Sequence, residues 1–215
     1  MLKIYGSDLS YPAIKVRLAA NAMGMEYEYI VVNLREGEHK KPNFLKINPV
    51  GKIPAIDDDG FTMFESNAII KYLADKNNSD LYPRGLKERA VIDQWIEFTS
   101  HHVGTAASKV FYNRFFAPRM GVAVDENSLK EGLGFLDRFL PIVDGQIGKD
   151  HFIVNNKLSL VDINLLAILD PAEVAKIDLS QYQNITRWRN ALKKKEFYTK
   201  CHKEYGESLK QSTGK

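Results

Sequence analysis

The sequence predicts an α/β domain with a mixed sheet, followed by a second domain made only of helices. Three observations indicate this. Short β-rich runs surround a helical pattern near the N-terminus, turn formers gather near residue 80, and no later segment resembles a strand. We therefore expect a first domain over 1–76, a linker over 77–86 and a helical domain over 87–215.

The first domain opens with a strand, a helix and a second strand. The β-rich run Leu2–Tyr5 is closed by Gly6. Residues 13–23 repeat apolar side chains with the period of a helix, and Gly24 follows the end of that pattern. Residues 26–33 alternate polar and apolar side chains, which predicts a strand. The core candidates of the helix are Ile14, Val16, Leu18, Ala19 and Ala22.

A loop, a hairpin and a helix complete this domain. Residues 34–48 are polar, with a short helical turn near 43–46. The turn Asp58-Asp59-Gly60 predicts a hairpin between 55–56 and 61–64, and 66–76 has a helical pattern. The order βαβ then ββα is that of a thioredoxin-like domain. Its crossover is parallel and its hairpin antiparallel, so the sheet should be mixed.

The second domain has the pattern of a helical bundle. Ser159 and Asp162 have the spacing of a capping box, which predicts a helix beginning there. We expect helices over 87–119 (interrupted mainly by Gly104), 127–146 and 160–175, and one or two over 184–212.

Composition limits the function classes. The chain has 215 residues, 44% of them hydrophobic and 27% charged, as in an ordinary soluble globular protein. A net charge of +3 is too small for a nucleic-acid footprint, and the basic run at 193–195 beside Trp188 and Arg189 is interpreted as a solvated helix face. With one cysteine, Cys201, an intrachain disulfide is excluded, and the adjacent His101 and His102 have no ligand partner at metal spacing. We expect no metal, no membrane span and a cytosolic location.

Residues 48–66 are the most informative part of the chain. Ile53-Pro54 lies directly before β-like residues, where a cis peptide bond would turn the backbone of Ile53 outward to pair with an extended peptide. Glu65 and Ser66 open a helix whose first amides favour a carboxylate, while the carboxylate of Glu65 suits an ammonium group. Glutathione carries both groups on its γ-glutamyl end.

This run resembles the glutathione-binding half of the cytosolic glutathione transferases. Residues 3–12 are similar to the first strand and active-site loop of that family, and 158–165 to its capping motif. Residues 37–49 are similar to the phi-type members in particular. The resemblance implies a homodimer that conjugates glutathione, as co-substrate and without a further cofactor, to a small hydrophobic electrophile.

Ser10 is the catalytic candidate. It lies between the first strand and the first helix, where a hydroxyl and helix amides favour a bound thiolate. The structural alternative is an N-cap serine with Tyr11 and Pro12 in the first turn. The resemblance places the phi-type catalytic serine on Ser10, which leaves Tyr11 and Tyr5 as weaker candidates.

The resemblance also maps contacts with glutathione. It implies that His39 and Lys40 bind the glycyl carboxylate of glutathione, and Lys41 could take the role of Lys40. The structural alternative is that this charged run is solvated, as most charged runs are. Lys52 stands where phi-type proteins commonly have glutamine. The expected glutathione-binding set is Tyr11, His39, Lys40, Lys52, Ile53, Pro54, Glu65 and Ser66.

An aromatic stretch late in the first long helix is the candidate hydrophobic pocket. Such stripes are usually core, but the family builds its second, apolar pocket from this region. The candidates are Phe111, Tyr112, Phe115 and Phe116. Two alternative functions remain: a glutathione-dependent peroxidase, and a non-catalytic glutathione-binding or regulatory protein of the same fold.

Overall fold

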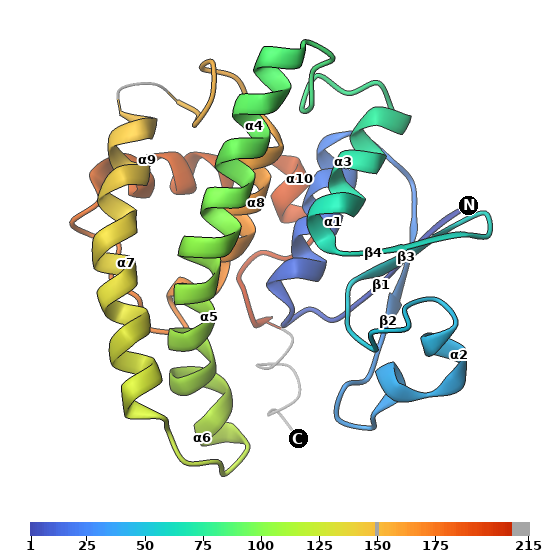
Figure 1. Cartoon of the computed structure of the whole chain (residues 1–215), viewed down its shortest axis with the longest axis horizontal. Coiled ribbons are helices and arrows are strands. Elements are labelled where there is room, and N and C mark those ends of the chain that lie inside the picture. The colour runs from blue at the N-terminus through green and yellow to red at the C-terminus, as the bar shows by residue number, and fades with distance from the viewer. Residues whose placement is uncertain (149–150, 208–215) are drawn as a thin grey trace. The chain divides into compact units, whose positions relative to one another are not determined.

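The computed structural model describes residues 1–148 and 151–207, which form two compact units (Figure 1). The first unit contains Met1–Tyr82 together with the residues from Glu196 onward. The second contains Pro83–Lys195. The part of the prediction for 184–212 that lies beyond residue 207 falls outside the described residues.

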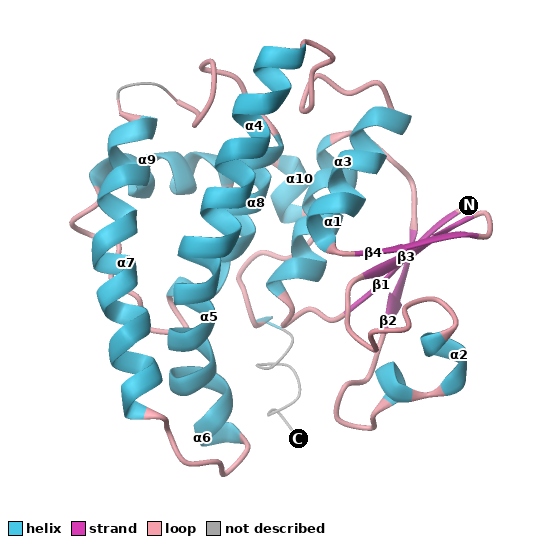
Figure 2. Cartoon of the chain, viewed as in Figure 1, coloured by secondary structure: helices cyan, strands magenta, loops and turns pink. Residues whose placement is uncertain are grey.

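The first unit is built on a four-stranded mixed sheet (Figure 2). The strands lie in the order β2-β1-β3-β4, with β1 parallel to β2 and antiparallel to β3, and with β3 antiparallel to β4. The predicted mixed sheet is confirmed. Their bounds are β1 Leu2–Gly6, β2 Glu28–Val31, β3 Ala55–Asp58 and β4 Phe61–Phe64.

The hairpin between β3 and β4 forms where its turn residues predict it. Asp59 and Gly60 have φ of 52° and 92°. Two positive φ angles at the central positions are what a tight primed turn requires. The amide of Gly60 also donates to Asp57 Oδ1 at 2.7 Å, and this side-chain hydrogen bond stabilises the turn.

Two helices cover one face of this sheet (Figure 1). The helix α1 (Tyr11–Ala22) packs against β1, and α3 (Ser66–Lys76) packs against β3, β4 and α1. Gly6 has no room for a side chain, because a Cβ there would lie 2.7 Å from Cβ of Ala13. The end of β1 therefore approaches α1 closely, and the loop between them is short. Of the predicted core positions in α1, Ala22 is only half-buried, since it lies in the last turn.

Residues 38–45 contribute Phe44 to a small hydrophobic cluster in the first unit. A 3-10 turn over Glu38–Lys40 precedes the short helix α2 (Pro42–Leu45). Phe44 of α2 is buried with Val32 and Ala55 and meets the Tyr5 ring edge-on, with ring centroids 6.1 Å apart. The ring of Tyr5 is thus part of this packing.

The second unit is helical throughout its regular structure. Its helices are α4 (Leu86–Phe98), α5 (Thr105–Phe111), α6 (Ala117–Arg119), α7 (Glu126–Ile147), α8 (Leu160–Leu169) and α9 (Gln183–Leu192). The short helix α10 (Glu196–Thr199) belongs to the first unit. None of the described helices combines the length and the apolar character that a membrane span needs.

Two wide, π-helical segments interrupt the long helical stretch, Thr99–Gly104 and Tyr112–Phe116. The first is held from α8, where the buried Asn164 donates to Thr99 Oγ1 at 2.7 Å and to the Ile96 carbonyl at 3.4 Å. These bonds satisfy polar groups at the edge of the wide turn. The predicted interruption at Gly104 is therefore a change of helical pitch within one continuous helical stretch.

Candidate functional site

Ser10 is the N-cap of α1. Its backbone is extended (φ −100°, ψ 99°), and its Oγ accepts a hydrogen bond from the amide of Ala13 at 3.4 Å. Because a serine hydroxyl can accept and donate at the same time, this cap leaves the Ser10 proton available for a second partner. The predicted alternatives, N-cap and thiolate donor, are therefore compatible in one side chain.

The loop before Ser10 is held by long-range contacts. Arg17 donates to Asp8 Oδ1 at 2.8 Å, and the Tyr205 hydroxyl donates to the Leu9 carbonyl at 2.6 Å. Arg17 also lies over the Tyr29 ring, 4.1 Å from its centroid. Burial raises the pKa of Tyr29, which keeps its phenol neutral. Sequence analysis did not identify these residues, because their partners are distant in the chain.

The start of α3 has an unusual backbone. Glu65 has φ 69° and ψ 105°, a region that non-glycine residues seldom adopt, and strain of this kind gathers at functional sites. The side chain of the N-cap residue, Glu65, makes no cap bond to α3. This helix start therefore lacks the cap that its own N-cap residue could supply, which suits an anion-binding helix end.

Lys15 is a further residue at the start of α3. Its side chain comes from α1, is only 3% exposed, and donates to Ser66 Oγ at 3.0 Å and to Asn67 Oδ1 at 2.6 Å. It connects the helix that Ser10 caps with the first turn of α3. Sequence analysis missed Lys15, because its neighbours Ile14 and Val16 point to other faces of the helix and its partners lie far away in the chain.

The turn before β3 has the predicted cis peptide bond at Ile53-Pro54. Ile53 is half-buried, Pro54 is buried and Lys52 is exposed. The buried Asn48 organises this turn, since its Nδ2 donates to the carbonyl of Lys52 at 2.6 Å. The strand β3 begins only at residue 55, so the backbone of Ile53 lies outside the β3 ladder.

His39 lies beside this turn. A Cβ built on Gly51 would be 3.1 Å from the carbonyl oxygen of His39, so the two loops are in close contact. Within the described residues, Nδ1 of His39 is buried without a hydrogen-bond partner, and such atoms need an explanation. Lys40 and Lys41 are exposed.

The four aromatic candidates lie in the second unit, at the end of α5 and in the π-helical segment after it. Phe111 and Phe115 are 5% and 1% exposed and stack with centroids 5.0 Å apart. Phe116 packs against both rings and is half-buried, whereas Tyr112 is 44% exposed. The guanidinium of Arg119 lies over the Phe115 ring, 3.9 Å from its centroid.

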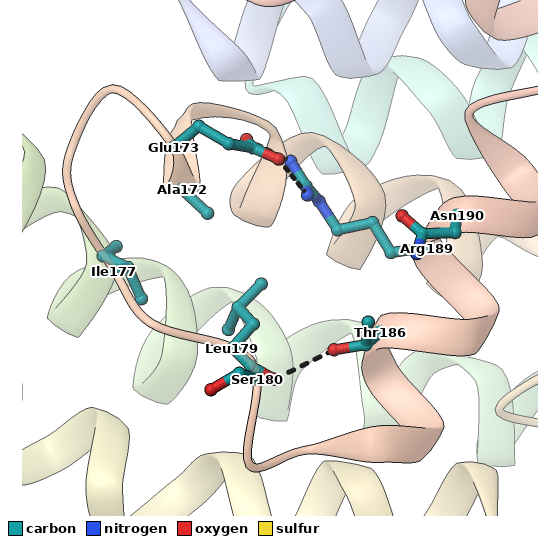
Figure 3. A pocket seen from close by; sticks show the side chains of 8 residues that line it. All are labelled: Ala172, Glu173, Ile177, Leu179, Ser180, Thr186, Arg189 and Asn190. Carbon is teal, nitrogen blue, oxygen red and sulfur yellow. Dashed lines mark hydrogen bonds and ion pairs between the residues drawn. The ribbon is translucent and has the colours of Figure 1, made fainter.

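A cavity in the second unit involves none of the predicted site residues (Figure 3). It has a volume of about 280 Å³ and lies between α9 and the segment before it. Arg189 crosses it and makes a bidentate pair with Glu173 at 2.6 and 2.7 Å. Arg189 and Trp188, which precede the basic run at 193–195, are 5% and 2% exposed. They face inward, while Lys194 and Lys195 are exposed.

The described residues contain no group of three or more His, Cys, Asp and Glu side chains that could hold a metal ion. His101 pairs with Glu97 Oε2 at 3.0 Å along one helical turn. The ring of His102 contacts both Phe98 and Phe139, with centroids 5.2 and 4.8 Å away.

Comparison with known proteins gives the same family for both units. The model of the glutathione S-transferase N-terminal domain matches residues 2–75, and that of the C-terminal domain matches 102–196. Glutathione S-transferase 1 of Zea mays is 30% identical over 195 residues, which cover 89% of this chain and 91% of that protein. Glutathione transferase F2 of Populus trichocarpa has a TM-score of 0.88 and 29% identity, covering 99% of this chain and all of that one.

A maize structure adds a bound product. Glutathione S-transferase I from maize, in complex with an atrazine glutathione conjugate, has a TM-score of 0.85 and 28% identity, covering 93% of this chain and 95% of that one. The matches extend through both units, from the sheet that positions Ser10 to the last helices. The chain therefore belongs to the glutathione S-transferase family.

Proposed function

We propose that this glutathione transferase activates its co-substrate through Ser10, whose hydroxyl donates a hydrogen bond to the glutathione thiolate. The observation that carries the proposal is the N-cap geometry. The Ser10 Oγ accepts from Ala13, its own proton is available, and it lies at the positive end of a 12-residue helix. Hydrogen bonds and a helix N-terminus both favour the ionised thiol.

The required energy is modest. An ordinary thiol has a pKa of about 8.5, so only about 3% is ionised at pH 7. Lowering the pKa by about two units needs about 2.7 kcal/mol and makes the thiolate the majority form. One charge-assisted hydrogen bond contributes about 1.5–3 kcal/mol and a helix terminus about 0.3–1 kcal/mol, which together reach this value.

The peptide part of glutathione binds, on this proposal, across the other loops of the first unit. The uncapped amides at Ser66 take the γ-glutamyl carboxylate, and Glu65 takes the ammonium group. The backbone of Ile53 pairs with the cysteinyl unit as an added strand does. His39 and Lys40 take the glycyl carboxylate, and the buried Nδ1 of His39 supports this role. Tyr11, Lys52 and Pro54 line the same site.

The electrophile lies, on this proposal, against the aromatic stretch of the second unit. Tyr112 and Phe116 have accessible surface to meet it, while the buried Phe111 and Phe115 support them from behind. The maize relative with an atrazine glutathione conjugate supports this class of substrate. The thiolate attacks an electrophilic carbon, the leaving group departs with the bonding electrons, and no metal or organic cofactor takes part. Holding both reactants together lowers the entropic barrier.

Ser10→Ala tests the proposal through its pH dependence. If the variant loses two pKa units of thiol activation, its conjugation of a chlorinated nitroaromatic falls about 25-fold at pH 7 and by less than about twofold at pH 9. The matched control is Ser180→Ala, an exposed serine of the second unit outside the proposed site, which should keep wild-type activity. Both variants should stay on glutathione-agarose. An equal deficit at both pH values would show that Ser10 does not act through ionisation.

The same assays separate the alternatives. Retention on glutathione-agarose without turnover in the wild type would favour a binding protein, and turnover of an organic hydroperoxide without conjugation would favour a peroxidase.

A homodimer and a cytosolic location complete the proposal. Light scattering across a dilution series measures the first, and a peak at the monomer mass throughout would refute it. Fractionation of cells measures the second, and recovery of the protein with membranes would refute it.

A further inference from the structure

The residues that follow the helical unit run back along α1 to the loop of Ser10. We name the described segment Glu196–Glu207 the C-terminal brace. It contains α10, which packs against α1 (Figure 1). Hydrogen bonds between described residues join it to α1 and the loop. They include Asn21 Nδ2 to the Phe197 carbonyl (3.0 Å) and to Cys201 Sγ (3.3 Å), Arg17 Nη2 to the Cys201 carbonyl (3.3 Å) and the Tyr205 hydroxyl to the Leu9 carbonyl (2.6 Å).

The direction of the brace follows from these pairs. As the residue number in the brace rises from 197 to 205, the number of its partner falls from 21 to 9. The brace is therefore antiparallel to α1 and reaches the loop at the residue before Ser10.

The brace is a packed element of the first unit. Tyr198, His202 and Tyr205 are 0%, 6% and 6% exposed. Their rings meet edge-on, with centroids 5.0 Å apart from Tyr198 to His202 and 6.2 Å from His202 to Tyr205. The Tyr205 hydroxyl is thus held in place by buried rings, and it can fix the group that it touches.

The brace holds the loop at two successive residues. Tyr205 bonds the carbonyl of Leu9 directly, and Arg17, itself bonded to the Cys201 carbonyl, bonds the Asp8 carboxylate at 2.8 Å. Ser10 is the next residue of the chain. Because the position of Oγ follows the backbone that carries it, these two contacts act on the hydroxyl of Ser10 together with the helix bonds that Ser10 makes to Ala13 and Ile14.

We propose that Tyr205 is a positioning residue for Ser10, and that its hydroxyl sets the loop geometry in which Ser10 activates the glutathione thiol. This inference rests on the function proposed above. Small displacements of a reacting group are costly, up to about 100-fold in rate for about 1 Å. Loss of one hydrogen bond to the loop is expected to cost about tenfold in kcat, which corresponds to about 1.4 kcal/mol.

Tyr205→Phe removes the hydroxyl and keeps the buried ring. Its kcat should fall about tenfold, its KM for glutathione should stay within about twofold, and the pKa of the bound thiol should rise. The matched control is Tyr182→Phe, another tyrosine at 7% exposure that lies in the helical unit, and this variant should keep wild-type values. An unchanged kcat and an unchanged thiol pKa in Tyr205→Phe would overturn the inference.

A double-mutant cycle with Ser10→Ala separates positioning from a general structural effect. If Tyr205 acts through Ser10, Tyr205→Phe causes no further loss in the Ser10→Ala background. The same tenfold loss in both backgrounds would overturn the inference while leaving the role of Ser10 intact. Full activity of Ser10→Ala itself would instead refute the proposed function.

Asp8→Ala gives a second test if Tyr205→Phe does not fold. The Asp8 side chain is 44% exposed, so its loss opens little of the core, and it frees the loop from its other anchor, Arg17. Its kcat should fall about threefold, and this loss too should vanish in the Ser10→Ala background. A loss that persists in that background would contradict control of Ser10 through the loop.

Discussion

Asp162 organises the start of α8, and its removal gives a stability prediction with a definite size. The carboxylate is fully buried and accepts four hydrogen bonds. Oδ1 accepts from the Ile153 amide at 3.1 Å and from Trp188 Nε1 at 3.0 Å, and Oδ2 accepts from the Ser159 amide and hydroxyl, both at 2.9 Å. The predicted capping box is confirmed, and Trp188 extends it to α9.

Asp162→Asn replaces one of these oxygens with an amino group that faces two donors. Each buried donor left without an acceptor costs about 1–3 kcal/mol, so the free energy of unfolding should fall by about 4 kcal/mol. For a chain of this size, about 4 kcal/mol corresponds to a decrease of roughly 10 °C in Tm.

Urea denaturation followed by tryptophan fluorescence measures this loss, because Trp188 reports directly on the site. Asp125→Asn is the matched control. Asp125 caps α7 by accepting from the Ser128 amide at 2.9 Å, it is exposed, and asparagine caps a helix as well as aspartate does. That control should stay within about 0.5 kcal/mol of wild type. If the free energy of unfolding of Asp162→Asn fell by less than about 1 kcal/mol, the four hydrogen bonds of Asp162 would not stabilise the fold as argued.

The loss in the free energy of unfolding caused by Asp162→Asn should also depend on pH. Burial raises the pKa of Asp162 from 3.8 to about 6, and its hydrogen bonds offset this only in part. Since the folded state binds the proton more tightly, the contribution of this group is greatest below pH 3.8 and is lost as the pH rises through about 6. Asparagine has no such titration, so the difference in the free energy of unfolding between wild type and Asp162→Asn should shrink by about 2 kcal/mol between pH 4.5 and pH 7.5. A difference that grows with pH would contradict this sign.

Two further predictions concern the start of α3. Lys15→Met removes a buried ammonium group that bonds Ser66 and Asn67, so the KM for glutathione should rise about tenfold in steady-state assays with little change in kcat. Lys15→Arg should restore most of the lost affinity. Equal KM values in Lys15→Met and wild type would show that the lysine contributes to packing alone. Glu65→Gly should raise the free energy of unfolding by about 1 kcal/mol, because glycine adopts a φ of 69° without strain. The same variant should bind glutathione more weakly in calorimetry. A variant that is less stable than wild type and binds glutathione equally tightly would contradict the idea that the strained backbone of Glu65 serves binding.

Local sequence patterns were sufficient for most of the fold. The hairpin followed from Asp59-Gly60, and the helix at 66–76 followed from its apolar period, because turn chemistry and amphipathic spacing depend on neighbouring residues. The π-helical segments were not predicted, since a change of pitch near 99–104 leaves the apolar pattern almost unaltered.

The contacts around the candidate site were harder to predict for a related reason. Lys15 and Tyr205 owe their roles to partners that lie far away in the chain, and a single sequence carries no signal for such pairs. The N-cap position of Ser10 could be predicted, because it follows from the residue's own place between a strand and a helix, and its proposed role in thiol activation stays a prediction.

The bond between Tyr205 and Leu9 spans 196 positions of the chain. At synthesis rates of roughly 5–20 residues per second, a ribosome needs about 10–40 s to travel that distance. A nascent polypeptide that already exposes its first strands and helices thus still lacks the hydrogen bond from Tyr205 to the loop before Ser10. Completion of this loop's contacts is therefore a late event, which follows synthesis of the helical unit that intervenes.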